Sequence, residues 1–504
     1  MVGAGLFTLV VLGPACGSNR RPTHELNIVP GTGTDGGAGG AAGSPGTGGA
    51  SGTQTVSDAG GSPRLCSDLF DQTILPTYEI DISADNWAKL DVDFHDLKDV
   101  LAGTPPQTEY PIVFKYGSET PSDATVRLRG KSSWVNTVQL DTNPKMQFVV
   151  SFDQINPKGK FHGVSSIHFE MPRDDWTFMN DRIGNNWLRK IGLTAPCANN
   201  AKLLVNGSYY GLYVSEGTVN ASLLKEFFPT NPGGDLLKGG TEVHTNIGST
   251  NWTRVGQLRA ATNIGALQSI VDLPNTVLEW AAEAAVNDAD GYYGGAHNYY
   301  IYDEGAPGYV WLPDHTDSAL EWLEVFTSLS YKQHPIYWWA GRPVAEVPPP
   351  DYLIVLNDPT WRAHYTDAIA TQIAKWDPNE ILGWITAWSA QIADAVTADP
   401  RRWATPAQFN QALAALRDVV VNRPKYLQSF VNCEHGVAAD STDQDRDGVP
   451  WCNDCNDNDP NVHPGAKEIC GNGIDDNCSG LIDQGCPGSP DAGATVSAPD
   501  ARGQ

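Results

Sequence analysis

Apolar and polar residues alternate along the part of the chain that follows residue 66, as half-buried β-strands require. Strand-like runs lie at 78–82, 110–116, 125–130 and 146–152, and the last two flank a polar loop. A β-hairpin is predicted over 201–213, where Asn206 and Gly207 supply the turn. This part of the chain is therefore predicted to be rich in strands.

Apolar residues recur every three or four positions at 174–191, which predicts an amphipathic helix. Lys190 in its last turn and Gly192 just beyond indicate where this helix ends. Further helices are predicted at 275–287, 367–376, 378–397 and 406–420. A β-rich part thus leads into an α-rich part, which predicts an α+β fold of two lobes with a ligand-binding cleft between them.

Residues 290–317 combine a predicted strand hairpin with an acidic loop at each end. Asp290 lies in a Gly-rich bend, Asn298 opens the first apolar run, and the second run ends in the sequence PDHTD, which includes Asp314 and Asp317. Protein kinases supply a catalytic carboxylate, a metal-binding amide and a metal-binding carboxylate in this order. The pattern predicts either a phosphoryl-transfer site or a chance acidic hairpin.

The composition changes abruptly at both ends of the chain. Residues 6–12 form an apolar run too short to cross a bilayer, and Cys16 follows closely, as in the signal peptide of a bacterial lipoprotein. Residues 30–63 are almost entirely Gly, Ala, Ser and Thr, which predicts a flexible linker. We therefore expect a membrane anchor through a lipid at Cys16, and a location in the cell envelope or on the extracellular surface; simple secretion is the alternative.

The expected domains are a signal peptide (1–16), a linker (17–65), a main domain (66–432), a Cys- and Asp-rich module (433–486) and a disordered tail (487–504). The formal net charge is −26, which argues against a nucleic-acid partner because phosphate binding needs basic patches. The expected partner is instead an unknown protein, either a substrate or a component of the envelope.

The C-terminal module contains the first half of an EF-hand-like calcium loop. Asp443, Asp445 and Asp447 alternate before a glycine, and Asp454 occupies the twelfth position of the loop. Six cysteines lie between Cys433 and Cys486, whereas Cys66 and Cys197 are isolated in the sequence. In an exported protein such a cluster predicts disulfides, whose pairing stays open.

Zinc is the other hypothesis for this module. It would be bound by four thiolates, those of Cys452, Cys455, Cys470 and Cys478. The oxygen-rich surroundings favour calcium with disulfides.

The main domain resembles the CotH family of atypical, secreted kinase-like proteins over residues 78–427. The resemblance rests on ordered blocks, namely 127–133 (RLRGKSS), Lys145, Asp181 with Arg182, 205–207 (VNG), 211–213 (GLY), Glu216, 236–238 (LLK) and 290–317. The family implies a protein-kinase-like fold that binds ATP with Mg²⁺ or Mn²⁺ and transfers the γ-phosphate to a Ser or Thr hydroxyl of a protein.

Carried over by position, Asp290 matches the catalytic carboxylate, Asn298 the metal-binding amide and Lys145 the lysine that neutralises the nucleotide phosphates. The resemblance also implies cofactor-binding roles for four further residues, Arg129, Ser132, Glu216 and Lys238.

The family usually ends its hairpin in Pro-Trp-Asp-x-Asp. In this chain His315 occupies the position of the first aspartate of that motif. Either Asp317 and Asp314 hold the metal, or the site is altered and the protein is a catalytically inactive pseudokinase with a structural or adhesive role at the cell surface.

Residues 440–486 resemble the short calcium repeats of thrombospondin type and the metal-binding modules of MopE-like exported bacterial proteins. The resemblance implies Ca²⁺ in the module, with Asp443, Asp445, Asp447 and Asp454 as ligands. Because the module lacks an apolar core, calcium and disulfides are expected to supply most of its stability.

Overall fold

The computed structural model describes residues 66–487 except 172, 174, 307, 321–333 and 338–348. The predicted signal peptide and linker, the lipid-anchor residue Cys16 and the tail beyond residue 487 lie outside the described residues. Within the described residues, no helix combines the length and the apolar character that crossing a membrane requires.

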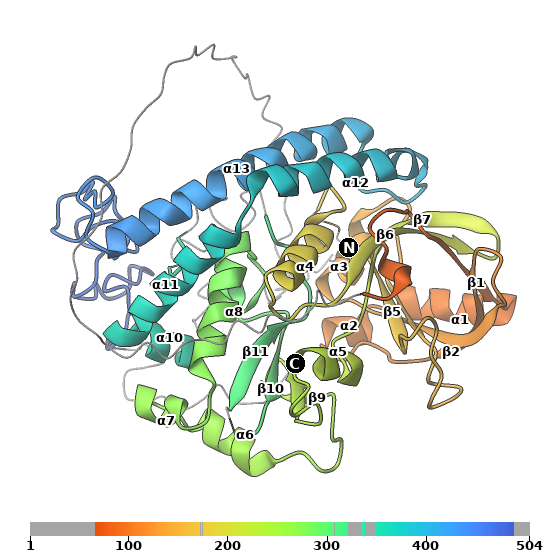
Figure 1. Cartoon of the computed structure of the whole chain (residues 1–504), viewed down its shortest axis with the longest axis horizontal. Coiled ribbons are helices and arrows are strands. Elements are labelled where there is room, and N and C mark those ends of the chain that lie inside the picture. Colours follow the sequence, from red (N-terminus) through yellow and green to blue (C-terminus); the bar gives the residue numbers. More distant parts are fainter. Residues whose placement is uncertain are drawn as a thin grey trace, which may run out of the picture.

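Seven strands of the first half close into a barrel, which lies at one end of the molecule (Figure 1). They follow the order β1-β2-β3-β4-β5-β7-β6, and β1 closes the barrel by pairing in parallel with β6. The strands are β1 (Thr77–Ile82), β2 (Tyr110–Tyr116), β3 (Ser122–Leu128), β4 (Phe148–Ser151), β5 (Ser166–Glu170), β6 (Ala198–Val205) and β7 (Ser208–Glu216).

The barrel interior is filled by aromatic side chains that the alternating pattern places on one face of each strand. Tyr78, Phe114 and Phe169 are fully buried, and their ring centroids lie 5.4 to 6.5 Å apart. The hairpin β6–β7 forms as predicted, because Asn206 and Gly207 both adopt the positive φ angles that a two-residue turn needs.

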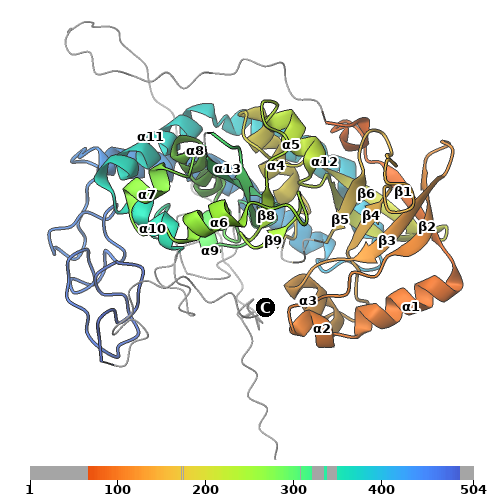
Figure 2. The same ribbon diagram turned by 90° about the horizontal axis from the view of Figure 1, so that it is seen from below.

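Three helices, α1 (Ala84–His95), α2 (Lys98–Leu101) and α3 (Ser132–Leu140), run along one side of the barrel (Figure 2). The prediction of a polar loop between β3 and β4 is wrong, since α3 occupies this place. Trp134 and Thr137 lie three residues apart on its buried face, and the Trp134 indole donates a 2.7 Å hydrogen bond to the Phe94 carbonyl. This apolar face was hidden in the sequence by the polar residues around it.

The second half is predominantly helical, and the α+β prediction is confirmed. Its helices are α4 (Asn180–Lys190), α5 (Ala221–Phe227), α6 (Trp252–Arg259), α7 (Ile264–Gln268), α8 (Leu273–Val286), α9 (Tyr292–Gly295), α10 (Pro350–Leu356), α11 (Pro359–Lys375), α12 (Pro378–Ala398) and α13 (Pro406–Glu434). The helix predicted at 174–191 begins only at Asn180, because the Asp175 carboxylate accepts hydrogen bonds from the Thr177 and Asn180 amides and bends the chain first. α11 and α13 are longer than predicted, and α13 continues through Pro424.

A second sheet lies within the helical half, in the order β11-β10-β8-β9. Its strands are β8 (Leu236–Lys238), β9 (Glu242–Val243), β10 (Tyr299–Asp303) and β11 (Tyr309–Pro313). The predicted hairpin is therefore confirmed as β10–β11, and β8 pairs with β10 so that Lys238 stands opposite Tyr300.

Helix α4 joins the barrel to the helical half. Its buried Arg182 donates hydrogen bonds to Gln72 before β1, to Asn200 on β6 and to Gln391 on α12. The guanidinium also lies 4.1 Å from the ring centroid of Trp388 on α12. One fully buried side chain thus fixes three segments that are far apart in the sequence.

All eight described cysteines are paired. The disulfides are Cys66–Cys197, Cys433–Cys452, Cys455–Cys478 and Cys470–Cys486. The four-thiolate zinc hypothesis is therefore wrong, because every one of its sulfurs is in a disulfide. Four disulfides indicate that the protein works outside the cytoplasm.

Candidate functional site

Asp290 and Asn298 meet at the start of the hairpin β10–β11. The Asn298 side-chain amide donates to Asp290 Oδ2 at 2.7 Å and to the Asp290 carbonyl at 3.0 Å. His297 Nδ1 lies 3.2 Å from Asp290 Oδ1. The structure thus brings together the carboxylate and the amide to which the sequence assigned catalysis and metal binding.

The Gly-rich bend after Asp290 forms the short helix α9, which requires glycine at position 294. A Cβ atom there would stand 2.7 Å from the Asp288 carbonyl oxygen, too close for any side chain.

The second acidic loop, residues 314–317, follows β11 directly and lies beside Asn298. The Asp314 amide donates to the Asn298 carbonyl at 2.7 Å, which fixes the two loops against each other. Lys238 Nζ is 2.5 Å from Asp314 Oδ2. Burial raises the pKa of Asp314, but Lys238, His315 and Arg129 outweigh it and hold this pKa well below its usual range.

His315 forms an ion pair with Asp317, with 3.0 Å between Nδ1 and Oδ1, and its Nε2 lies 3.9 Å from Asp314 Oδ2. Burial lowers the pKa of His315, yet Asp317, Asp314 and Asp181 raise it to about 10. The imidazole is therefore protonated at neutral pH, and it stands as a cation between two carboxylates that were predicted to bind metal.

Helix α4 holds the loop 314–317 through hydrogen bonds from its first two turns. Asp181 Oδ1 accepts from the Thr316 amide at 2.7 Å, and Thr316 Oγ1 lies 3.0 Å from Asn185 Oδ1. Asn185 in turn donates to Glu216 Oε1 at 2.8 Å. Burial raises the pKa of Glu216 to about 7, against the lowering effect of His315 and Arg129. Glu216, predicted to bind cofactor, thus lies beneath the loop and acts on it through Asn185 and Thr316.

Two of the residues predicted to bind cofactor, Lys238 and Arg129, interact with groups of the acidic loop 314–317. Lys238 is bound to Asp314, and Arg129 forms an ion pair with Glu170 on β5. The positive charge of Arg129 also acts to lower the pKa values of Asp314, Asp317 and Glu216. Among the described hydrogen bonds and ion pairs, none joins Ser132, the first residue of α3, to these groups.

Lys145 is not brought to the acidic loops. Its side chain is 1% exposed, and Nζ lies 2.7 Å from Asp399 Oδ2 at the end of α12 and 2.5 Å from the Leu212 carbonyl oxygen. The ammonium also faces the Tyr213 ring at 4.5 Å. This lysine joins the barrel to α12, and a contact with nucleotide phosphates would require the Asp399 ion pair to open.

Sequence reasoning missed Asp288, two residues before Asp290. Its carboxylate is 1% exposed, and neither oxygen has a hydrogen-bond partner among the described residues. Burial raises the pKa of Asp288 well above its usual range, and Glu283, Asp317 and Asp290 raise it further. An aspartate directly after the apolar residues of α8 was the available signal.

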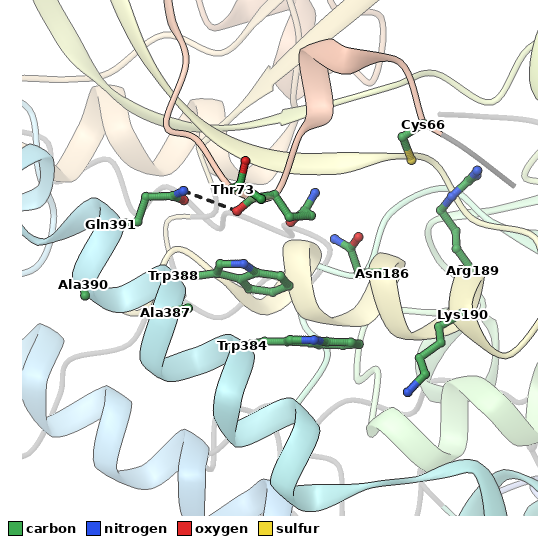
Figure 3. Close-up of a pocket in the computed structure, with 11 residues that line it drawn as sticks. Cys66, Thr73, Asn186, Arg189, Lys190, Trp384, Ala387, Trp388, Ala390 and Gln391 are labelled. Carbon is green, nitrogen blue, oxygen red and sulfur yellow. Dashed lines mark hydrogen bonds between the residues drawn. The ribbon is translucent and has the colours of Figure 1, made fainter. Parts of the chain in front are cut away.

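A cavity of about 910 Å³ lies elsewhere, between α4, α12 and the segment that begins at Cys66 (Figure 3). Trp384 and Trp388 stack in its wall with 5.5 Å between ring centroids, and Asn186 and Lys190 project from α4. Since none of the predicted site residues lines this cavity, the chemistry is assigned to the acidic loops.

The C-terminal module gathers carboxylates as predicted. One oxygen from each of Asp445, Asp447 and Asp454 lies within 4.8 Å of the other two. The Oδ1 atoms accept hydrogen bonds from the backbone of their own loop, whereas all three Oδ2 atoms have no partner among the described residues. Asp454 is 3% exposed. Burial, Asp447 and Asp445 raise the pKa of Asp454 to about 6, so these oxygens form a site suited to a hard cation.

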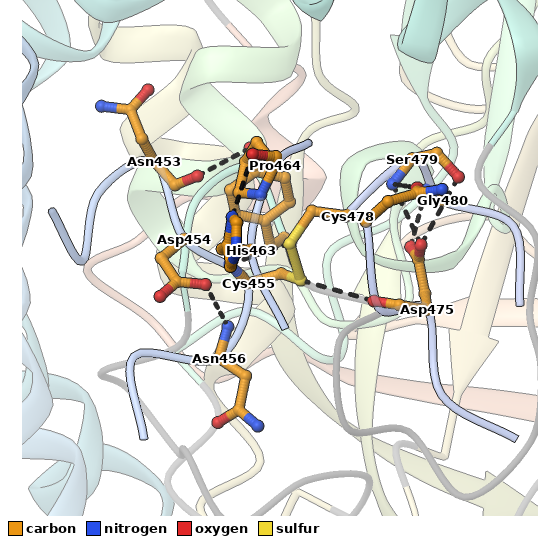
Figure 4. Close-up of a disulfide and its surroundings, with 12 residues drawn as sticks. Asn453, Asp454, Cys455, Asn456, His463, Pro464, Asp475, Cys478, Ser479 and Gly480 are labelled. Carbon is orange, nitrogen blue, oxygen red and sulfur yellow. Dashed lines mark hydrogen bonds between the residues drawn. A yellow bond between two sulfur atoms is a disulfide. The ribbon is translucent and has the colours of Figure 1, made fainter. Parts of the chain in front are cut away.

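Two further groups surround this centre. Asp443, Asp445 and Asp457 form a second group, in which one carboxylate oxygen of each lies within 4.8 Å of the other two. Asp454 also lies near Cys455 and Cys478, but these sulfurs are bonded to each other and offer no thiolate (Figure 4). Within these three groups, oxygen atoms alone are thus available to a metal.

Comparison with known families gives two matches. A family model described as "CotH kinase protein" matches residues 126–427, which is more than half of the chain. A model of MopE type, described as "Putative metal-binding motif", matches residues 454–484. No curated protein matches the chain. The first match covers Arg129, Asp290 and the loop 314–317, and the second begins at Asp454. The resemblances to the CotH family and to MopE-like modules are therefore confirmed.

Proposed function

Because the chain belongs to the CotH kinase family, we propose that it is an exported kinase that transfers the γ-phosphate of ATP to Ser or Thr hydroxyls of a protein. The observation that carries this proposal is the placement of Asp290 and Asn298, hydrogen-bonded to each other, directly beside the loop 314–317. Catalysis of phosphoryl transfer consists mainly of positioning and charge stabilisation, which this arrangement of groups suits.

Each group has a role that follows from its place. Asp290 is 30% exposed at its side chain, so a substrate hydroxyl can reach it and pass its proton to the carboxylate. Arg129 and Lys238 carry the positive charge that phosphate oxygens need. Glu216 and Asp181 position the loop 314–317 through Asn185 and Thr316.

The oxygen atoms of Asn298, Asp314 and Asp317 suit Mg²⁺ or Mn²⁺ in kind. The side-chain nitrogen of Asn298 faces Asp290, which leaves the side-chain oxygen Oδ1 of Asn298 for the metal. When bound, the metal would neutralise charge on the phosphates. His315 must then give up Asp317 or move aside, because a protonated imidazole is no ligand.

The ion pair between His315 and Asp317 also favours a second candidate function. If His315 keeps Asp317 occupied, the domain is a pseudokinase, which contributes to a surface structure or to adhesion without transferring phosphate. The contacts of His315 with Asp317 at 3.0 Å and Asp314 at 3.9 Å are the specific observation behind this alternative.

Labelled ATP distinguishes the two candidates. The purified full chain is incubated with ATP labelled at the γ-phosphate and with Mg²⁺ or Mn²⁺, alone and with envelope proteins. We expect label on protein, lost in Asp290→Asn and kept in Asp394→Asn, a matched change of an exposed carboxylate on α12. Equal labelling of wild type and Asp290→Asn, or no label at all with either metal, overturns the kinase proposal.

The C-terminal module is proposed to bind Ca²⁺ at Asp445, Asp447 and Asp454, with Asp443 and Asp457 close by. Extracellular modules bind calcium with a Kd of about 0.1 to 1 mM, which suits a structural role. Calorimetric titration of the full chain should show binding in this range, weakened by Asp447→Asn and unchanged by Asp459→Asn, which lies outside the clusters. Absence of binding at millimolar Ca²⁺ contradicts the assignment.

A lipid at Cys16 is proposed to anchor the protein in the cell envelope, on the basis of the apolar run before this cysteine. Metabolic labelling with a fatty acid should mark the wild type and fail to mark Cys16→Ser. Equal labelling of both forms contradicts the anchor.

A further inference from the structure

The calcium loop of the C-terminal module is also the part that packs on the kinase-like domain. Residues 451–453, here called the docking tripeptide, lie between Asp447 and Asp454. The ring centroid of Trp451 is 5.4 Å from that of Tyr426, 6.2 Å from that of Phe430 and 5.8 Å from that of His334. The tryptophan is thus enclosed by aromatic side chains of the larger domain.

The backbone of the docking tripeptide is held by hydrogen bonds. The Cys452 carbonyl oxygen lies 2.9 Å from His334 Nε2 and accepts from Arg362 at 3.2 Å. The Asn453 carbonyl accepts from the Tyr337 hydroxyl at 3.4 Å. Arg362 is itself fixed by two hydrogen bonds to the Glu434 carboxylate, at 2.7 and 3.2 Å. These side chains belong to the kinase-like domain, so the two parts are joined by polar contacts that depend on geometry.

The Cys433–Cys452 disulfide ties the tripeptide to the end of α13. Carboxylates on both sides of the tripeptide provide a second constraint. Asp447 precedes the tripeptide and Asp454 follows it at once, and one oxygen of each points to the same centre as Asp445. Without a cation, three carboxylates within 4.8 Å repel one another, and the buried Asp454 oxygen is unpartnered. A bound Ca²⁺ removes this repulsion and fixes the chain before and after the tripeptide, at Asp447 and at Asp454.

A continuous series of contacts leads from this surface to the catalytic turn. Pro335, next to His334, accepts hydrogen bonds from the hydroxyls of Tyr352 and Tyr365 at 3.3 and 2.6 Å. The Tyr352 ring lies 5.2 Å from Trp280 on α8, and Trp280 stacks at 5.3 Å on Tyr292, which is two residues after Asp290. The docking surface therefore supports the elements that position Asp290.

We propose that Ca²⁺ in the C-terminal module stabilises the kinase-like domain, because the ion holds the docking tripeptide on His334, Tyr337 and Arg362. The partner of the calcium loop is thus the catalytic domain of the same chain. Calcium outside the cytoplasm then strengthens the support of the Asp290 turn. This inference rests on the calcium binding proposed above.

The test uses the full chain in millimolar Ca²⁺ or in a calcium chelator. Calorimetry should show the unfolding transition of the kinase-like domain raised by roughly 2 to 4 °C with calcium, as a ligand at 10 times its Kd provides. Hydrogen exchange of the backbone at 290–298 should slow in the same samples.

The variant Trp451→Ala separates binding from docking. It should still bind Ca²⁺ by titration calorimetry, while calcium no longer shifts the transition of the larger domain. Tyr337→Phe, which removes the hydroxyl that donates to the Asn453 carbonyl and accepts from Arg362, should reduce the shift if Trp451→Ala fails to fold. Trp384→Ala in the cavity wall is the matched control and should keep the full shift.

The outcomes distinguish the two claims. If the wild type binds no Ca²⁺, the calcium assignment fails and this inference fails with it. If the wild type binds Ca²⁺ but neither the transition nor the exchange at 290–298 changes, or if Trp451→Ala keeps the full shift, the inference alone is overturned.

Discussion

At the scale of single residues, His315 decides what the kinase-like site can do. Its protonated ring pairs with Asp317 and offsets part of the charge of Asp314, so in this structure it takes part of the electrostatic role of a metal cation. A divalent metal must compete with this ion pair for the same oxygens. The site should therefore bind metal more weakly than one with a third carboxylate at this position.

The substitution His315→Asp is expected to tighten binding of Mg²⁺ with ATP by about 10-fold or more, since it removes a cation and adds an oxygen ligand. Titration calorimetry of wild type and variant measures this directly. His315→Gln, which removes the charge without adding a carboxylate, should fall between the two. Unchanged or weaker binding in His315→Asp would show that His315 does not compete with the metal.

His334 makes a second residue-scale prediction, on pH dependence. Its Nδ1 accepts from the Ile336 and Tyr337 amides, and its Nε2 contacts the Cys452 carbonyl, so the ring is held neutral. Burial, with Arg362 and Arg423 nearby, lowers its pKa to about 3. As the pH falls below about 6.5, His334 binds a proton in the unfolded chain but not yet in the folded one. The stability contributed by His334 is therefore complete above about pH 6.5 and is lost progressively as the pH falls toward 3.

Between pH 6.5 and 5 this loss should amount to about 2 kcal/mol of the free energy of unfolding. Urea unfolding of the full chain at several pH values measures it. The component should vanish in His334→Gln and persist when the exposed His435 is replaced by Gln. An identical pH profile in His334→Gln would be evidence against the neutral, buried ring.

At the scale of elements, helix α4 and the hairpin β10–β11 build the site together. Gly184 on α4 lies against Thr316, so close that an added Cβ would stand 2.8 Å from the Thr316 Cβ atom. This close packing lets Asp181 and Asn185 reach the loop 314–317. The helix therefore serves as the support on which the predicted metal loop is fixed.

Gly184→Ala is expected to destabilise the domain by about 1 to 3 kcal/mol, because the new methyl group must displace Thr316. Gly383→Ala on α12 is the matched control. No atom lies within 4 Å of the Cβ position there, so the change should be neutral or stabilise by up to about 1 kcal/mol. Urea unfolding measures both variants, and equal stability of the two would contradict the packing described for α4.

The elements also show what the sequence could predict. The hairpins at 201–213 and 299–313 were foreseen because turn residues and alternation are local signals. The contact of Lys145 with Asp399 joins positions 254 residues apart, and no local pattern indicates it. For the same reason a lysine on a strand near RGKSS was assigned to the nucleotide. Asp288 was overlooked although a local signal existed, since it directly follows the apolar residues of α8.

At the scale of the whole molecule, the barrel lies at one end, the helical half in the middle and the calcium module at the other end (Figures 1 and 2). From composition and periodicity, the sequence predicted the order of these three parts along the chain. It could not predict the cysteine pairing, because Cys66 and Cys197 are 131 residues apart and meet only in the folded chain. The docking of the calcium loop is likewise a contact between distant segments.

The two acidic loops around β10–β11 are proposed to form a working phosphoryl-transfer site. The most direct measurement is the mass of the purified full chain after phosphatase treatment and then incubation with ATP and Mn²⁺, for wild type, Asp290→Asn and Asp394→Asn. We expect added phosphate on the wild type and Asp394→Asn, and none on Asp290→Asn. A wild type that gains no phosphate, or an Asp290→Asn variant that gains as much, would contradict it.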